Sequence, residues 1–284
     1  MRPRNLPLTS QPALRVGLAL GSGSARGWAH IGVIRALEQA GVRPDLVCGT
    51  SIGSLVGAAY AAGELDRLEQ WALSLRPGEV IKFLDVSPRR GLVKGERIMS
   101  FFQRNFRDRP LEELGMPFAA VATSLENGAE VWLRRGSTLG AVRASIAIPG
   151  LLAPVQHEGS VLVDGGLVNP VPVSLARAMG AEFVIAVDLN SDLAGRHLRA
   201  RPQRGDVTMP PPLVLASAIN IMQVRITRSR LAGEPPDLLV TPRLAHFGLL
   251  DYHRAEEGIE EGRRAVERVA SALSDAGPLL SGAR

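Results

Sequence analysis

The stretch Val47-Cys48-Gly49-Thr50-Ser51-Ile52-Gly53-Ser54 joins an apolar run to a stretch of small residues. Residues 44–48 predict a short buried strand, and residues 52–62 predict a helix. A Gly-x-Ser-x-Gly turn at such a junction strains its serine, and glycine on either side avoids clashes with the neighbouring strand and helix. Ser51 is therefore expected to stand at a helix N-terminus, where its hydroxyl can act as a nucleophile. The alternative is a chance match, because the chain holds 30 glycines.

Strand and helix patterns alternate around this stretch. Residues 14–20 predict a strand, a glycine-rich loop follows, and apolar residues recur at helical spacing over residues 28–40. Another helix is predicted over residues 64–75. Such alternation favours an α/β fold, with a mostly parallel sheet covered by helices on both faces.

The rest of the chain continues the same domain. The dipeptide Asn127-Gly128 predicts a β-hairpin. The other expected elements are, in chain order, a surface loop (86–95), a helix (96–106), hairpin strands (117–124 and 129–134), a helix (139–148), a second hairpin (155–163), a helix (173–179), a strand buried on both faces (183–189), a helix (213–231), a strand (238–241) and a C-terminal amphipathic helix (252–273). We expect an N-terminal extension at 1–14, a catalytic core at 15–190, a mobile loop at 191–212, and C-terminal elements at 213–284 that complete the core.

Composition narrows the class of protein. The chain has 284 residues, of which 45% are hydrophobic, enough for a sizeable core. Its single cysteine, Cys48, permits no internal disulfide framework, and a reducing compartment is the simplest assumption. The first fourteen residues lack the apolar run of a signal peptide, and glycines and polar residues interrupt the uncharged stretch 46–63. We expect no transmembrane helix and a cytoplasmic protein, peripheral at most at the inner membrane surface.

The charge of the chain bears on its partners. A formal charge of +5 and a pI of about 10.2 favour anionic surfaces, either membrane or nucleic acid. Arginines are scattered and aromatic residues make up only 4%, so nucleic-acid binding is not expected. The apolar segment 213–222 allows transient docking on anionic lipid, although a core helix is the preferred interpretation. The sequence contains no Cys/His cluster with the spacing of metal ligands, so no metal site is expected.

The glycine-rich loop Gly21-Ser22-Gly23-Ser24-Ala25-Arg26-Gly27 has two possible functions. A dinucleotide site is disfavoured, because the loop is one residue longer than the Rossmann pattern and no acidic residue ends the next strand. An oxyanion hole fits better, because a loop at a helix N-terminus presents backbone amides and small residues let an acyl carbonyl approach them. Arg26 adds a positive charge to the loop, and the competing interpretation is a surface residue or a structural ion pair.

A base for Ser51 can come from two places. Asp164, in Asp164-Gly165-Gly166, ends a predicted strand on a tight turn, from which its carboxylate could reach a serine on the neighbouring strand. A purely structural Asx turn is the competing interpretation. His197, His246 and His253 all follow Asp164, so the order of a Ser-Asp-His triad is also available. Packing or solvent contact explains His30 and His157.

Together these motifs resemble the patatin-like phospholipases, in particular the bacterial RssA-like branch related to neuropathy target esterase. The resemblance runs from about Val16 to Leu189, and includes Ala144-Ser145-Ile146-Ala147-Ile148-Pro149-Gly150 and Asn169-Pro170-Val171-Pro172. It implies a three-layer α/β/α fold and a Ser51-Asp164 dyad that works without histidine. It also implies an oxyanion loop at residues 21–27, with amides from Gly23 to Ala25 facing the acyl group. The chain departs from the family in one respect, because Ser22 and Ser24 replace two glycines of the loop.

The function implied is hydrolysis of a fatty acyl ester, with phospholipid, lysophospholipid and simpler esters all suited to the same dyad. No cofactor is implied. The competing hypothesis is a regulatory adaptor or acyl-ligand-binding protein that uses the same fold with little hydrolysis.

Overall fold

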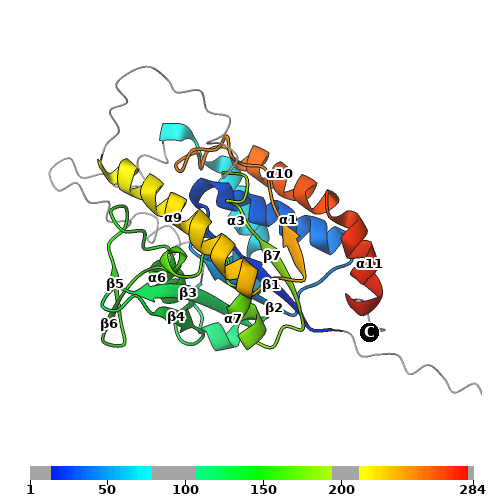
Figure 1. Ribbon diagram of the computed structural model, residues 1–284, viewed down its shortest axis with the longest axis horizontal. Helices are drawn as coiled ribbons and strands as arrows, with labels where there is room; N and C mark the ends of the chain where they lie inside the picture. The colour runs from blue at the N-terminus through cyan, green and yellow to red at the C-terminus, as the bar shows by residue number, and fades with distance from the viewer. Residues whose placement is uncertain (1–13, 79–106, 194–210, 281–284) are drawn as a thin grey trace, which may run out of the picture.

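The computed structural model describes residues 14–78, 107–193 and 211–280. Within these ranges an eight-stranded sheet forms the centre of the molecule (Figure 1). Its parallel part has the order β3-β2-β1-β7-β8, and its antiparallel part comprises β4, β5 and β6. The strands are β1 (Val16–Leu20), β2 (Leu46–Thr50), β3 (Phe118–Ser124), β4 (Glu130–Leu133), β5 (Val155–His157), β6 (Ser160–Asp164), β7 (Phe183–Val187) and β8 (Leu238–Val240).

Alternate residues of the parallel strands feed two apolar cores, one on each face of the sheet. Five-residue strands such as β1 and β2 are buried along their whole length, as expected for parallel strands covered on both faces. One face is covered by α1 (Ala29–Gln39), α2 (Ile52–Ala61), α3 (Leu65–Ser74), α6 (Thr138–Ser145), α10 (Ala255–Glu267) and α11 (Ala270–Leu280). The other face packs against α7 (Val173–Ala178) and the C-terminal end of α9 (Pro211–Gly233). The fold is therefore three-layered.

Strand β3 organises the site, because β2 and β6 lie along the same edge of it. Residues 122 and 123 of β3 pair with both β4 and β6, and residues 120 and 121 pair with both β2 and β4. Since a strand has only two edges, β2 and β6 share the edge opposite β4. β2 ends at Thr50 opposite Val121, and β6, running the other way, ends at Asp164 opposite Ala122. The carboxyl ends of β2 and β6 therefore meet end to end.

Most predicted elements are confirmed to within a few residues. The first hairpin turns at Asn127-Gly128, where Gly128 has a φ of 71°, and β7 is buried as expected. The predicted C-terminal helix is instead two helices, α10 and α11, separated by a turn at Arg268 and Val269. The predictions for residues 86–106, and most of the loop predicted at 191–212, lie outside the described residues, although Pro211 and Pro212 already belong to α9.

The helix predicted at 213–231 exists, but it is not the core helix that its composition favoured. Among the side chains of this helix that the structure describes, those of Ile219, Gln223 and Thr227 are buried. Several of its apolar side chains are instead exposed to solvent, namely Val214, Leu215, Ile221 and Met222. The helix lies on the outside of the molecule (Figure 1).

Candidate active site

Ser51 lies in the turn between β2 and α2, with φ 56° and ψ −125°. A non-glycine residue rarely adopts a positive φ, so the surrounding structure must hold the turn in place. A Cβ on Gly49 would overlap the carbonyl oxygen of Gly53, and a Cβ on Gly53 would overlap that of Leu20. Both glycines are thus required by close backbone approach, as the sequence pattern predicted.

The backbone of Ser51 is anchored by two other serines. Its amide donates to the Oγ of Ser145 at 2.9 Å, and its carbonyl accepts from the Oγ of Ser54 at 2.6 Å. Ser145 is fully buried at the end of α6. These contacts orient the Ser51 side chain toward the end of β6.

The Oγ of Ser51 donates a hydrogen bond of 2.6 Å to the Oδ2 of Asp164. The other carboxylate oxygen, Oδ1, accepts from the amide of Gly166 at 2.7 Å, and the backbone carbonyl of Asp164 accepts from the Oγ1 of Thr123. The predicted tight turn is thus present, and it coexists with the contact to Ser51. The two residues meet along the edge of β3, not across a pair of neighbouring strands as the sequence had led us to expect.

Burial tunes the carboxyl of Asp164, which has no exposed surface. Removal from water raises the pKa of Asp164 to about 7, against the opposing effect of the hydrogen bonds from Ser51 and Gly166. A carboxyl with that pKa is a far better proton acceptor than an ordinary aspartate, and it is substantially ionised at neutral pH.

The glycine-rich loop runs from the end of β1 into a short 3₁₀ helix, η1 (Ser24–Trp28). Most of its amides are already used: Gly21 donates to Val187, Ser22 to Pro170, Ala25 to Leu249 and Arg26 to Gly23, in each case to a carbonyl oxygen. Within the described part of the chain, the amides of Gly23 and Ser24 donate to no acceptor. Ser24 has a φ of 51°. The loop therefore offers two adjacent amide donors.

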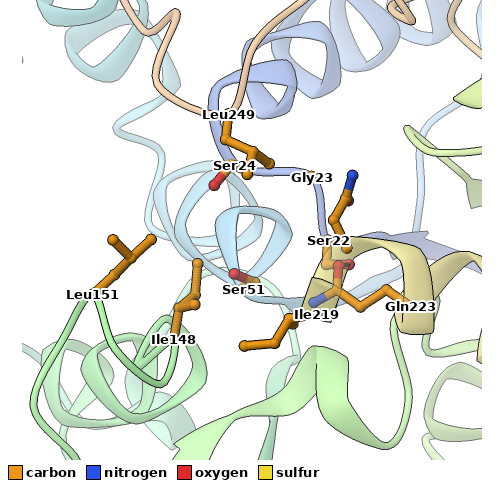
Figure 2. A pocket seen from close by; sticks show the side chains of 10 residues that line it. Ser22, Gly23, Ser24, Ser51, Ile148, Leu151, Ile219, Gln223 and Leu249 are labelled. Atoms are coloured by element: carbon orange, nitrogen blue, oxygen red, sulfur yellow. Dashed lines mark hydrogen bonds between the residues drawn. The ribbon is translucent and has the colours of Figure 1, made fainter. Parts of the chain in front are cut away.

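These two residues and Ser51 border one small cavity of about 20 Å³ (Figure 2). The glycine loop, the segment after α6, the loop before α10 and helix α9 surround it. It is lined by Ser22, Gly23, Ser24, Ser51, Ile148, Leu151, Ile219, Asn220, Gln223 and Leu249. A cavity of this size has room for about one water molecule and none for an acyl chain.

A family model described as "Patatin-like phospholipase" matches residues 18–177, a range that holds the loop, Ser51 and Asp164. The chain belongs to the patatin-like phospholipase family. This patatin-like chain is 41% identical over 201 residues to an uncharacterized NTE family protein of Mycobacterium tuberculosis, covering 70% of this chain and 56% of that protein. It is 40% identical over 184 residues to the human patatin-like phospholipase domain-containing protein 6, covering 62% of this chain and 13% of that one.

The chain thus spans about half the length of the mycobacterial relative, and far less of the human one. Among solved structures, VipD from Legionella pneumophila aligns with 96% of this patatin-like chain and 78% of its own, at 12% identity and a TM-score of 0.38.

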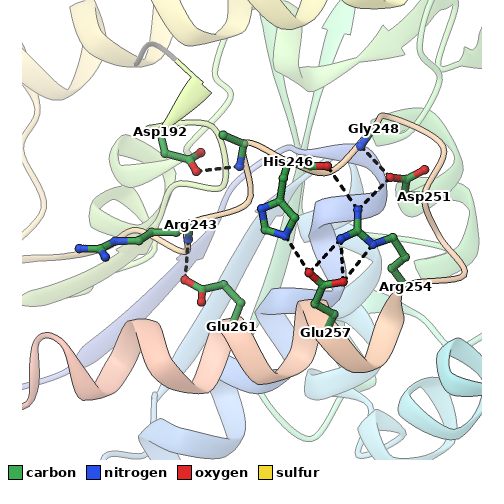
Figure 3. A network of polar contacts seen from close by, with 9 residues as sticks. Asp192, Arg243, His246, Gly248, Asp251, Arg254, Glu257 and Glu261 are labelled. Atoms are coloured by element: carbon green, nitrogen blue, oxygen red, sulfur yellow. Dashed lines mark hydrogen bonds and ion pairs between the residues drawn. The ribbon is translucent and has the colours of Figure 1, made fainter. Parts of the chain in front are cut away.

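The described histidines lie away from the serine of this patatin-like site. None lines the cavity in the part of the chain that the structure describes. His246 is half exposed, and its Nε2 contacts the Oε1 of Glu257 at 2.7 Å, in a network that includes Arg254 (Figure 3). His253 is exposed. The prediction for His197 lies outside the described residues.

Two further histidines were expected to serve packing or solvent contact. His30 is fully buried, and its Nε2 lies 2.7 Å from the carbonyl oxygen of Gly21. Burial lowers the pKa of His30 to about 4, although that hydrogen bond opposes the shift, so its ring is neutral at pH 7. It supports the start of the glycine loop. His157 ends β5, in the hairpin.

Sequence reasoning missed the contribution of α9. The Oε1 of Gln223 accepts from the Oγ of Ser22 at 3.0 Å, and the Oδ1 of Asn220 accepts from the Nη2 of Arg26 at 2.9 Å. Arg26 is nearly fully buried, so it is part of the support of the loop. About two hundred residues separate each pair, and no local pattern could have joined them.

The described residues contain neither a cluster of metal ligands nor a helix suited to spanning a membrane. No group of three or more His, Cys, Asp or Glu side chains there has the arrangement needed to hold a metal ion. In the same ranges, no helix combines the length and the apolar character needed to cross a bilayer.

Proposed function

We propose that this protein is a serine acyl hydrolase that cleaves fatty acyl esters of lipids with a Ser51-Asp164 dyad. The 2.6 Å hydrogen bond between Ser51 and the buried Asp164 carries the proposal. A serine hydroxyl bonded to a carboxylate of raised pKa has a base in place for proton transfer. Family membership supports the same chemistry.

The reaction follows from these contacts. The ionised Asp164 takes the proton as Ser51 Oγ attacks the ester carbonyl, and the amides of Gly23 and Ser24 stabilise the tetrahedral oxyanion. The alcohol leaves with the proton returned by Asp164. A water molecule, deprotonated by the same carboxylate, then releases the fatty acid and restores Ser51.

The other loop residues support this arrangement in our proposal. Gly21, Ala25 and Arg26 hold the loop through their backbone bonds, and Gly27 allows η1 to approach Ile52. Gly165 lies where a Cβ would overlap the carbonyl oxygen of Val121, so it brings the Asp164 turn against β3.

Fluorophosphonate labelling of the full chain, followed by peptide mapping, tests the nucleophile. We expect labelling at Ser51 in the wild type and none in Ser51→Ala. Ser74→Ala is the matched control, because Ser74 is an exposed serine at the end of α3 that does not line the cavity, so its loss leaves Ser51 and its contacts intact. Labelling that persists in folded Ser51→Ala contradicts the assignment.

Hydrolysis of a long-chain acyl ester tests the base. Asp164→Asn is expected to lower kcat/KM by roughly 10²–10⁴-fold, the usual contribution of a general base. His246→Ala and His253→Ala should retain activity. If either histidine variant loses activity as Asp164→Asn does, a Ser-Asp-His triad replaces the dyad.

The small cavity favours one alternative function, an adaptor or acyl-ligand-binding protein with little hydrolysis. Turnover of a long-chain acyl ester by the wild type, lost in Ser51→Ala, separates the two functions. We further propose that the enzyme works in the cytoplasm and contacts a membrane surface transiently. Its net charge supports that contact, and its one thiol, Cys48, is buried and bonded to the Pro172 carbonyl oxygen.

A further inference from the structure

Helix α9 buries two polar side chains and leaves several large apolar side chains exposed to solvent. On its inner side Gln223 and Thr227 are buried, together with Ile219. Its outer side carries four large apolar side chains with exposed fractions of 44–52%, namely Val214, Leu215, Ile221 and Met222. A surface helix of a globular protein normally has the opposite orientation. We call Val214, Ile221 and Met222 the outer stripe of α9.

The bonds that hold α9 over the site are few and polar. Gln223 bonds to Ser22, and Asn220 bonds to Arg26, so both contacts join the helix to the glycine loop. The amide of Gln223 also lies where a Cβ on Gly166 would be, next to the Asp164 turn. The Oγ1 of Thr227 is buried with no hydrogen-bond partner among the described residues. Near the site the helix therefore adds to these polar bonds one buried apolar side chain, Ile219, whereas its C-terminal end is held by the ion pair of Arg230 with Glu130.

The small cavity at Ser51 has α9 as one of its walls. Ser51 is only 4% exposed, and Ile219, Asn220 and Gln223 of α9 form one wall of the 20 Å³ cavity. Figure 2 shows Ile219 and Gln223 on the same side of Ser51. A cavity of this volume cannot hold a long acyl chain, so part of its lining has to move before such an ester reaches Ser51. Part of the opposite wall, at Leu249, belongs to a segment stiffened by the Arg254 network (Figure 3).

The chemistry of the outer stripe identifies its partner. Arg225 and Arg228 follow the stripe toward the C-terminal end of α9, and both are exposed. Neither forms an ion pair with any other residue that the structure describes. Arg228 still interacts electrostatically with the carboxyl of Asp188. Apolar side chains flanked by exposed arginines match a surface of acyl chains beneath anionic headgroups.

We propose that α9 is a gate that an anionic lipid surface opens. The outer stripe inserts among the lipids, Arg225 and Arg228 contact the headgroups, and the bonds from Gln223 and Asn220 to the glycine loop break as the helix moves. The cavity then opens toward the membrane, where the ester substrate lies. The identity of the substrate in this proposal rests on the proposed hydrolase function. The docking of α9 on a lipid surface does not depend on that function.

Vesicle binding tests the surface without any catalysis. Full-length Ser51→Ala is mixed with vesicles of phosphatidylcholine alone, or of phosphatidylcholine with phosphatidylglycerol, and bound protein is measured by flotation. We expect binding to the anionic vesicles, and at least about tenfold weaker binding when Ile221→Gln and Met222→Gln are added. Leu125→Gln is the matched control, because Leu125 is 56% exposed but lies in the β3–β4 hairpin.

Opening is tested by the rate of fluorophosphonate labelling of Ser51. We expect anionic vesicles to raise this rate about tenfold in the wild type, and Gln223→Ala with Asn220→Ala to raise it without vesicles.

Equal binding by the stripe and control variants overturns the docking surface, as does a failure of the protein to bind anionic vesicles. Binding with an unchanged labelling rate overturns the gate. Self-association in solution that disappears in the stripe variant makes a second copy the occupant, and also overturns the proposal. If Ser51 is labelled under no condition, the proposed hydrolase function fails. The vesicle-binding experiment tests the lipid surface independently of that result.

Discussion

Two helices meet at Ser51, and they are built in opposite ways: α2 begins directly after it, and α9 lines the cavity beside it. In α2 nine of the ten residues are buried, and Gly53 touches the backbone of Leu20. In α9 the apolar side chains of the outer stripe face solvent, and polar bonds reach the site. Displacing α2 would expose a core, whereas displacing α9 at the site breaks a few hydrogen bonds worth about 1 kcal/mol each and exposes one buried apolar side chain, Ile219. The difference gives Ser51 a tightly packed support in α2 and a more weakly held neighbour in α9.

The buried carboxyl of Asp164 contacts Ser51 at the start of α2, and its titration should give the largest effect on stability. Because the pKa of Asp164 is raised to about 7, the folded protein keeps its proton over a range where the unfolded chain has lost it. The wild type therefore loses stability as pH rises from about 4 to about 7. The Asp164→Asn side chain does not titrate, so this variant does not lose that stability. The difference between its free energy of unfolding and that of the wild type should therefore increase by roughly 1.4 kcal/mol per pH unit in this window.

Urea unfolding at several pH values measures this difference, with the exposed Asp275→Asn as control. The activity of the wild type should change in the opposite sense, because only ionised Asp164 accepts the proton. Its kcat/KM should rise with pH to a plateau above about 7. A rise centred near the ordinary aspartate pKa, about 4, would show that water reaches the carboxyl and that the cavity is open.

The same substitution in the two helices should have opposite consequences. Gly53→Ala places a Cβ on the carbonyl oxygen of Leu20, and should cost at least about 3 kcal/mol because backbone must move. Gly233→Ala, at the end of α9, meets no atom within 4 Å, and should be neutral or stabilising by about 0.4–1 kcal/mol. Denaturant unfolding of both variants decides the matter, and a small cost for Gly53→Ala would remove the reason for glycine in the elbow.

The contacts of α9 should have smaller effects on stability. Gln223→Ala removes the bond to Ser22 and should cost about 1 kcal/mol, while it raises the labelling rate of Ser51 about fivefold. Gln39→Ala, on the exposed end of α1, is the control for removal of an amide. If labelling slows instead, Gln223 helps to build the site and does not restrain the helix.

Sequence predicted the elements of the fold where local physics determines them. The apolar runs of β1, β2 and β7 and the turn at Asn127-Gly128 depend on neighbouring residues, and they were found. The break between α10 and α11 was missed, because apolar spacing continues through Arg268 and Val269. The outward direction of α9 was also missed. An apolar composition does not state which side of a helix faces the protein, and segment 213–222 was accordingly interpreted as core.

The candidate site divides in the same way. The motif Gly-x-Ser-x-Gly requires close backbone approach by its own glycines, so Ser51 could be recognised from five residues. Its meeting with Asp164 depends on β2 and β6 sharing one edge of β3, a pairing that no single strand pattern contains. Family resemblance supplied the dyad, and the bond from Gln223 to Ser22 appeared only in the structure.

The last comparison places one hydroxyl on each helix, and the effect expected in α9 is the smallest of those predicted. Val56 in α2 is fully buried, so Val56→Thr puts a hydroxyl where it lacks water, and should cost about 1–3 kcal/mol. Ile221 in α9 is 51% exposed, so Ile221→Thr keeps a β-branched side chain and should change stability by less than about 0.5 kcal/mol. Thermal and urea unfolding without lipid measure both. A large loss of stability in Ile221→Thr would mean that the outer stripe is covered in solution. The contrast between a buried α2 and an exposed α9 would then be wrong.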